Sequence, residues 1–545
     1  MGSSALGAIG FAFEPTAAPG EQDGFFLPYQ AVAASFSAAN QPSNSSGMRA
    51  HVRVYFNTAV GTVTIAGKDI NGNAISETVP PTGSIPVYNN QAATGEQGAF
   101  DYVTQNVYGS INASGITTTG ITGGFIKVSG IYAARYLLPA TAKITPKYGE
   151  FSPDEHRALG DLHTHKAQTV KDVDLQLDTA LYPDESLWAL YAFVNSVTNP
   201  STPPSVPSSP TSLLVATAVS GSPLSLTTQP TAPGMKLILT IAGASITGTI
   251  TVAGISTLTG EAITEQIAVG TGTNGTYYSA NAFQSVNASG ITVTGFTSGT
   301  LAVSGVYGWS RSALPSLNPF TLTTEWFTGT DSICVPFSAF SEFSLDYDVE
   351  KEFKFSAKGI GQDYLPIGNR STNPLNTSRM ANLPQPLDTP QVPWAGQVFI
   401  DPLSNSPGTT VFGDILSGKI TITNPLKAVH KMSNRQTMTT IYRKKWAIAV
   451  EAKIDYTNLL QFENWRQDIK QYVQFSFYGQ PIGGGNIPTI TFIIPFKFNK
   501  FEATSTPESD FVQVDLAGFG EYDPGIGASY QISWANSRMA PNYTS

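Results

Sequence analysis

One stretch of sequence occurs twice in this chain and decides the expected fold. Residues 335–361 read VPFSAFSEFSLDYDVEKEFKFSAKGIG, and residues 494–520 read IPFKFNKFEATSTPESDFVQVDLAGFG. In both, an apolar-Pro-Phe triplet opens an alternating strand, a polar turn follows, and a return strand ends in Gly-x-Gly, each landmark 159 residues from its counterpart. Alternating strands around a polar turn predict a β-hairpin. The sequence therefore predicts the same hairpin in two related halves.

A strand and a helix are expected before each hairpin. Apolar and polar residues alternate at 172–178 and at 446–455, and each stretch ends on an aspartate, Asp178 and Asp455. Apolar residues then recur at helical spacing after Pro183, and again across a second set, Phe462, Trp465, Ile469, Tyr472 and Val473. Each half is therefore expected to be a β-sheet domain that carries one amphipathic helix packed on its own sheet.

A sharper repeat lies in the least charged parts of the chain. Residues 111–132 and 286–307 are identical at 14 of 22 aligned positions, and GTVTIAG at 61–67 matches GTITVAG at 248–254. Runs of Val, Ile and Thr with Gly and Asn between them predict short antiparallel strands. At about 75–85 residues each, the two copies have the size of small immunoglobulin-like β-sandwiches.

The expected domain order is nested. The first half spans 1–46, 133–200 and 308–361, because one β module at 47–132 and a second at 234–307 interrupt it. The remaining segments are a Pro/Ser-rich connector at 201–233, a Pro-rich linker at 362–394, and the second half at 395–545. The expected fold class is mainly β.

Composition excludes several classes of protein. The net charge is −9 and only 13% of the residues are charged, so the basic footprint of a nucleic-acid reader is missing. The single cysteine, Cys334, rules out an intramolecular disulfide and a multi-thiolate metal site. No apolar run approaches the roughly 18 residues of a membrane span, so no membrane segment is expected.

Catalytic motifs are also missing from the sequence. There is no G-x-S-x-G elbow, no phosphate-binding P-loop and no H-E-x-x-H pair, so we expect no enzyme activity and no cofactor. A weak metal candidate is the group His156, His163 and His165, because His-x-His on a strand points two imidazoles to one side. The competing interpretation is an exposed polar loop, and on that interpretation no metal is expected.

The repeated layout resembles a known family. Strand, amphipathic helix, strand and a long hairpin ending in Gly-x-Gly resemble the tail tube proteins of long-tailed bacteriophages. The GTVTIAG modules resemble the immunoglobulin-like decoration domains of phage structural proteins. The resemblance implies two fused tail-tube-type β-sandwich domains that form a barrel, each with one flanking α-helix, and two inserted β-sandwich modules.

The resemblance also implies a function. Six tube domains close a ring in that family, so a chain with two such domains would form trimeric rings with pseudo-sixfold symmetry. Stacked rings make the hollow tube that conducts genomic DNA into the host. The implied partners are further copies of the chain, a tape measure protein in the lumen, and tail terminator and distal tail proteins. The implied location is the virion tail, assembled in the host cytoplasm.

Candidate residues follow from that expectation. An acidic lumen repels DNA phosphates, so DNA would pass without specific binding. The lumen candidates occupy the polar faces of the two related strands, although those faces could equally be outward and solvated: Asp172, Asp174, Asp178, Glu451 and Asp455. The candidates for contacts between stacked rings are Tyr148, Glu150, Phe151, Asp154, Asp348, Glu350, Lys351, Glu508 and Asp510. The N-terminal arm at 11–29 and the C-terminal tail at 536–545 are candidates for bridging subunits.

A different class of function remains open at this point. A fibre, baseplate or capsid decoration protein would use the Gly/Thr-rich modules to bind host-surface glycans. Deleting 47–132 or 234–307 would then abolish adsorption, whereas a tube would still assemble.

Overall fold

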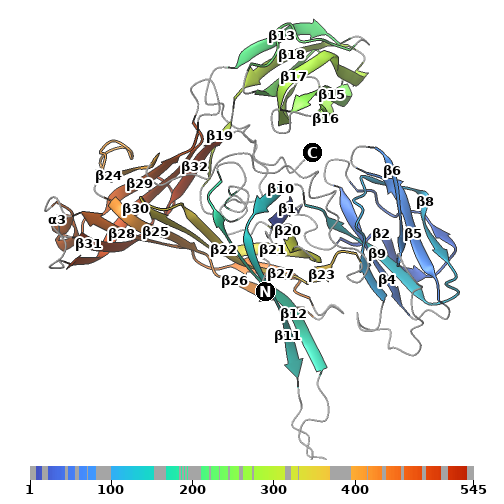
Figure 1. The fold of residues 1–545 in the computed structure, drawn as a ribbon, viewed down its shortest axis with the longest axis horizontal. Coiled ribbons are helices and arrows are strands. Elements are labelled where there is room, and N and C mark those ends of the chain that lie inside the picture. The colour runs from blue at the N-terminus through green and yellow to red at the C-terminus, as the bar shows by residue number, and fades with distance from the viewer. Residues whose placement is uncertain are drawn as a thin grey trace, which may run out of the picture.

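The computed structural model describes most of the chain. The described residues are 8–14, 22–42, 47–55, 60–69, 72–80, 100–134, 136–151, 167–182, 186, 190, 193, 210–219, 223–231, 234–243, 246–256, 262–272, 275–296, 298–307, 309–313, 321–328, 331–368, 395–413, 415–431, 437–455, 460–480, 487–504 and 513–536. Within them the expectation of a mainly β protein is confirmed, and the named strands pair antiparallel in open sheets (Figure 1).

The two halves share an order of six strands in their sheets, and the first half has one further strand, β10, at its end. In the first half the order is β11 (Thr141–Phe151), β12 (Ala167–Ala180), β22 (Lys354–Gly361), β21 (Asp331–Asp348), β20 (Leu322–Thr328), β1 (Ala8–Phe13) and β10 (Tyr136–Pro139). In the second half it is β25 (Ile415–Thr423), β28 (Ala447–Asp455), β31 (Gln513–Gly520), β30 (Thr489–Thr504), β29 (Gln471–Tyr478) and β24 (Gln397–Pro402). The chain is therefore a structural duplication.

One strand pair joins the two halves. The outer part of β21 pairs with β25, from Glu342 opposite Thr423 to Asp348 opposite Ser417. The result is a continuous run of eight antiparallel strands in the order β11, β12, β22, β21, β25, β28, β31 and β30. Alternate residues of this run enter one apolar core that includes Leu175, Phe343, Ile420 and Phe492. A single core therefore spans both halves.

The repeated hairpins form as expected, with a difference of one residue between them. Each has a β-bulge beside its Gly-x-Gly segment, where Gly359 pairs with Phe340 and Gly518 pairs with Phe498. The glycines are 159 residues apart, but their partners are 158 apart. Between the bulge and the turn, Phe501 of the second hairpin is consequently the structural equivalent of Phe343 in the first. A shift of one residue in a strand exchanges its two faces. The one-residue difference at the bulge is therefore what directs Phe501, like Phe343, toward the core.

The Gly-x-Gly segments are required by close packing between strands. A methyl group on Gly359 would overlap the carbonyl oxygen of Ala339, and one on Gly518 would overlap that of Lys497. Backbone oxygen cannot move away as a flexible side chain can. The first glycine of each Gly-x-Gly segment is therefore needed for the two strands of its hairpin to approach.

The second helix is shorter than expected. Helix α3 spans Leu460–Arg466, and the rings of Phe462 and Trp465 pack on Phe501. Asp468 has a φ of 58°, and the N–H of Ile469 bonds the carbonyl of Asn464 at 2.9 Å, which is the Schellman end of a helix. The expectation that Tyr472 and Val473 continue the helix is wrong, because both lie in β29.

The first helix is described at three positions. Ser186, Leu190 and Phe193 are helical, and the last two are buried in the shared core, with the ring of Phe193 6.2 Å from that of Phe343. The other positions of the helix expected after Pro183 lie outside the described residues. Each helix thus packs on the same position of its hairpin, since Phe343 corresponds to Phe501.

The first module consists of two four-stranded sheets around its own core (Figure 1). One sheet is β2 (Gln22–Ala31), β9 (Phe125–Tyr132), β4 (Met48–Tyr55) and β7 (Phe100–Val103), and the other is β3 (Ser35–Phe36), β8 (Ser110–Thr119), β5 (Thr62–Lys68) and β6 (Ala74–Val79). The boundary expected at 47 is therefore too late, because β2 and β3 pair inside this module. The N-terminal arm at 11–29, a candidate for bridging subunits, is likewise part of the sheets of its own chain. Strand β1 pairs with β20 and β10, and β2 and β3 pair inside the first module.

The second module is a six-stranded sheet that folds around a separate core. Its order is β13 (Thr211–Ala218), β18 (Thr300–Val306), β14 (Met235–Ala242), β17 (Gly275–Phe296), β15 (Ile246–Ser256) and β16 (Ala262–Gly272). Strand β13 falls in the expected connector at 201–233, so this module also begins earlier than its repeat suggests. The module consequently includes a strand for which the repeat gave no sign.

Short strands complete the described fold. They are β19 (Trp309–Ala313), β23 (Leu365–Pro366), β26 (Leu426–Val429), β27 (Thr440–Arg443) and β32 (Gln531–Asn536). Strand β19 pairs with β32, so this part of the expected first half joins the sheet of the second half. Strand β23 lies beside β21 as β32 lies beside β30, which extends the duplication to the ends of both halves.

Candidate functional site: a charged sheet face and two open strand edges

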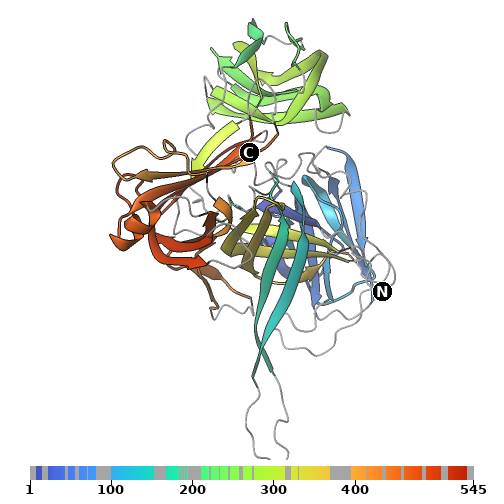
Figure 2. The same ribbon diagram turned by 60° about the vertical axis from the view of Figure 1, so that its left-hand side comes forward.

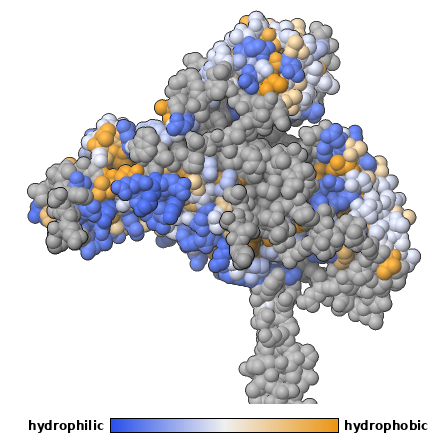
Figure 3. Space-filling view, in the orientation of Figure 1, coloured by the Kyte–Doolittle hydropathy of each residue, from blue (hydrophilic) through white to orange (hydrophobic). Residues whose placement is uncertain are grey.

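One face of the eight-stranded run carries many charged side chains, although apolar residues such as Ile360 and the exposed Phe519 also lie on it. Residues that point away from the core include ten carboxylates, Asp172, Asp174, Asp178, Glu342, Asp346, Asp348, Glu451, Asp455, Glu502 and Asp515, and seven lysines, Lys143, Lys147, Lys354, Lys358, Lys419, Lys453 and Lys500. Figure 3 shows hydrophilic residues gathered across the left part of the view, where Figure 1 places β25 and β28. We call this surface the charged face; acids outnumber lysines on it.

Ion pairs between strands cross the charged face. Lys147 Nζ lies 2.5 Å from Asp174, Lys358 Nζ lies 2.7 Å from Glu342, and Lys419 Nζ lies 3.0 Å from Asp346. These pairs are solvent-exposed, and pairs of that kind contribute only about 0–1 kcal/mol each. Their main effect is therefore to neutralise the lysines, so the unpaired charge that remains on the face is negative.

All five lumen candidates lie on the charged face. Asp172, Asp174 and Asp178 are on β12, while Glu451 and Asp455 are on β28. The strands β22, β21 and β25 separate β12 from β28, so the structure brings the candidates to one face without bringing them into contact. They form an extended acidic surface and not a compact site.

Two of these carboxylates have side-chain partners that the sequence did not indicate. Asp178 accepts hydrogen bonds from Ser356 at 2.5 Å and from Gln176 at 3.1 Å. Asp172 is half-buried, which raises its pKa, and His430, whose Nε2 lies 3.1 Å away, opposes that rise. A histidine 258 residues distant leaves no local pattern, so only the fold reveals this pair.

The stacking candidates lie at two described places. Tyr148, Glu150 and Phe151 are at the end of β11, in the long β11–β12 hairpin that extends away from the other strands (Figure 2). Asp348, Glu350 and Lys351 form the exposed β21–β22 turn, in which Lys351 Nζ lies 2.8 Å from Asp348. Asp154, Glu508, Asp510 and the tail after Asn536 lie outside the described residues.

Two strand edges remain open among the described strands, at opposite ends of the eight-stranded run. Strand β11 pairs with β12 along one edge, and no described strand pairs with its other edge. On β30, residues 500–504 pair with β31, and no described strand pairs with their other edge. The corresponding edge of β21 is the one that β25 occupies. The described part of the chain therefore contains one complete junction, between β21 and β25. The open edge of β30 corresponds to the β21 side of that junction, and the open edge of β11 corresponds to its β25 side.

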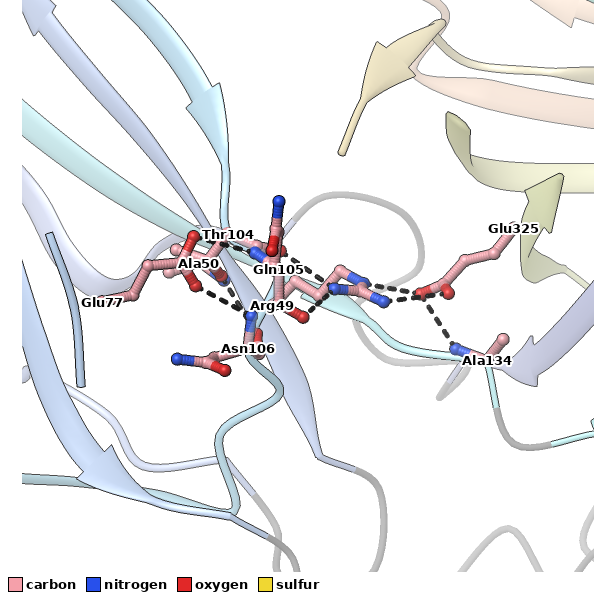
Figure 4. A network of polar contacts seen from close by, with 8 residues as sticks. All are labelled: Arg49, Ala50, Glu77, Thr104, Gln105, Asn106, Ala134 and Glu325. Atoms are coloured by element: carbon pink, nitrogen blue, oxygen red, sulfur yellow. Dashed lines mark hydrogen bonds and ion pairs between the residues drawn. The ribbon is translucent and has the colours of Figure 1, made fainter. Parts of the chain in front are cut away.

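A buried ion pair fixes the first module to the first half (Figure 4). Arg49 on β4 donates to both carboxylate oxygens of Glu325 on β20, at 2.7 and 3.1 Å, and also to the carbonyls of Thr104 and Gln105. The backbone N–H of Ala134 donates to the same carboxylate at 3.1 Å. The two residues are 276 positions apart in the sequence, so no local pattern indicates that they pair.

The weak metal candidate cannot be placed. His156, His163 and His165 lie outside the described residues, and the described part of the chain has no cluster of three or more His, Cys, Asp or Glu side chains suited to a metal. Nor does any helix in that part combine the length and apolar character needed to cross a membrane.

Comparison with models of protein families and with curated proteins found no match to this chain.

Proposed function

We propose that this protein is a structural subunit that polymerises through its sheet edges into rings, and that the rings stack into the hollow tail tube of a bacteriophage. One observation carries the proposal: two equivalent sheets are joined edge to edge inside the chain, and the same two edges are open at the ends of the run. A heterologous contact of this kind, repeated between copies, forms a ring or a helix. Open edges otherwise invite uncontrolled aggregation, and closure removes them.

The number of chains in a ring follows from the duplication together with the family resemblance. The resemblance implies six equivalent sheets in a ring, so three chains would form it, with a symmetry that is threefold by chain but nearly sixfold by sheet. The eight strands of each chain then contribute to one closed barrel. Because the charged face lies opposite the core on every strand, closure with that face inward lines the lumen with carboxylates.

The acidic excess suits a channel for DNA. Affinity for DNA depends mainly on Lys and Arg that neutralise phosphates, and three of the seven lysines of this face already form ion pairs with carboxylates on neighbouring strands. A wall of this kind lets DNA slide without holding it. A tape measure protein in the same lumen, terminator and distal tail proteins at the tube ends, and a virion location complete the proposal.

Electron microscopy of the purified protein tests this function. We expect hollow tubes of uniform bore, and a variant that lacks the second module, residues 210–307, should form them too, because that module has its own core. A protein that stays monomeric at high concentration and neutral pH, with no tubes in micrographs, would contradict the proposal.

A second function is favoured by one feature of the first module. Tyr29 and Phe125 are 46% and 38% exposed, and their rings stack at 4.8 Å and 8°. Exposed flat rings of this kind suit the apolar faces of sugars, as a glycan-binding decoration protein requires. The variant Tyr29→Ala should then lose glycan binding in an array and keep assembly, whereas unchanged binding would exclude this site.

A further inference from the structure

We propose that the open edge of β11 pairs with the open edge of β30 in a second copy of this chain, in the same register as the internal junction between β25 and β21. The inference rests on the proposed function, since it names the residues through which copies join. The junction between β25 and β21 inside the chain supplies the register.

The internal junction shows which residue of β11 is equivalent to each residue of β25. Row by row, Ile420 on β25 lies opposite Val450, Val450 lies opposite Gly518, and Gly518 lies opposite Phe498. In the first half the same row is Ile144, Leu175, Gly359 and Phe340. Ile144 on β11 is therefore the counterpart of Ile420.

The other side of the junction is matched in the same way. Ile420 lies opposite Leu345, and Leu345 lies opposite Phe355 on β22. In the second hairpin the counterpart of Phe355 is Val514, which lies opposite Ala503. The internal register thus transfers to Ile144 opposite Ala503 of the next copy.

The transferred register places like faces together. Moving one residue along each antiparallel strand puts Thr145 opposite Glu502 and Pro146 opposite Phe501. Ile144, Pro146 and Phe501 are partly buried on the core side, whereas Thr145 and Glu502 are exposed on the charged face. A slip of one residue would put Phe501 opposite Thr145 or Lys147 of the charged face, so the pattern of faces selects this register over its neighbours.

The charges are also compatible with this register. Glu502 lies diagonally between Lys143 and Lys147 of the other strand, at the roughly 7–8 Å over which long side chains still interact. Lys147 faces Lys500, but each of these lysines has a carboxylate of its own, Asp174 at 2.5 Å and Glu502 at 2.8 Å. Asp174, Lys147, Lys500 and Glu502 together carry no net charge, so the two facing lysines are each compensated.

Proline distinguishes the proposed junction from the internal one. The N–H of Asn424 bonds the carbonyl of Ser341 at 2.8 Å, so alternate residues of β25, including Ile422, direct their N–H groups to β21. Pro146 takes the place of Ile422 on β11 and has no N–H. One ladder hydrogen bond is missing between copies, which makes this open edge less adhesive to foreign strands.

Engineered disulfides test the register. Directly opposed residues of antiparallel strands have Cα atoms within the 4.4–6.8 Å that a disulfide spans. The test variant is Thr145→Cys with Glu502→Cys in the same chain, and the native Cys334 is buried and does not interfere. The matched control is Thr421→Cys with Ser344→Cys, the same pair in the internal junction. A misregistered control is Thr141→Cys with Glu502→Cys.

Oxidation should cross-link the test variant into covalent dimers and trimers on a denaturing gel. The internal control should oxidise without any change of mass, and the misregistered control should remain monomeric. Under reducing conditions the test variant should assemble as the parent does, which shows that it folds.

Two results would overturn the inference in distinguishable ways. If tubes form but the test variant gives no interchain product, or the misregistered pair cross-links equally well, the register is wrong and the proposed function stands. If the parent protein forms neither rings nor tubes, the proposed function fails together with the inference.

Discussion

Arg49 and Glu325 illustrate how two single residues attach a whole module. Both side chains are at most 2% exposed, and the carboxylate has three donors within 3.1 Å. A buried charge without its partner is costly, because the low-dielectric surroundings cannot replace water. The pair therefore makes the position of the first module on the sheet specific.

We expect Glu325→Gln to destabilise the protein by about 3–5 kcal/mol, because it leaves the buried Arg49 guanidinium uncompensated. Urea unfolding followed by fluorescence measures the loss. Asp348→Asn is the control, since it breaks the exposed pair with Lys351 and should cost under about 1 kcal/mol. Equal effects of the two variants would refute a structural role for the buried pair.

Asp401 gives a second prediction, about pH. Burial would raise the pKa of this carboxyl, but hydrogen bonds from Thr410, Thr409 and Gly408 outweigh burial and hold the pKa below 3.8. A depressed carboxyl pKa stabilises the fold above the ordinary pKa, and the gain is lost as pH falls through the lower value.

Asp401→Asn should consequently lower stability by about 1–3 kcal/mol at pH 7. The difference from the parent should shrink as the pH is lowered below 3.8, which thermal melts at a series of pH values can measure. A difference that stays constant down to the acid limit would show that the charge has no part in holding the loop.

At the scale of elements, the sequence predicted what repeats locally and missed what depends on distant contacts. The hairpins, the alternating strands and a helix before each hairpin were predictable, because spacing and turn residues encode them. The end of α3 at Arg466 depends on the positive φ of Asp468, and the bulges depend on pairing across a hairpin. Strands β2 and β13 lie outside the repeated segments, so repeat boundaries could not include them.

The close approach at the hairpins yields a third prediction. Gly518→Ala should destabilise the protein by about 1–3 kcal/mol, because its methyl group would overlap a backbone oxygen on β30. Gly413→Ala is the control, since no atom lies within 4 Å of the added methyl group. Chemical denaturation should separate the two, and an equally harmless Gly518→Ala would mean that the strands can move apart freely.

In the whole molecule, the charged residues are distributed unevenly between the inserted modules and the eight-stranded run. The modules have few charged residues, whereas the eight-stranded run carries acids and lysines on one continuous face. The two related strands at 172–178 and 446–455 predicted five acids of this face. The sequence also predicted the strands of both hairpins, but it could not show that all these strands add residues to one face, because that depends on pairing between the two halves. The junction between β21 and β25 is equally invisible in the sequence.

Reversal of one carboxylate on the charged face gives a fourth prediction. Tubes of the variant Glu451→Lys should retain double-stranded DNA at low salt, because lysines displace counterions from phosphates. Co-sedimentation of DNA with tubes measures this retention. A control with the same charge change on the second module, Thr264→Lys with Gln266→Lys, should retain less. Equal retention by both variants would show that the charged face does not line the channel.

Cryo-electron microscopy of the assembled protein, viewed along the tube axis, would show whether both halves of the chain contribute sheets to one ring. We predict rings of three chains that show six nearly equivalent sheets, with the face of Asp174 and Glu451 toward an open lumen. Rings built through the modules, or sheets whose charged face points outward, would contradict the account.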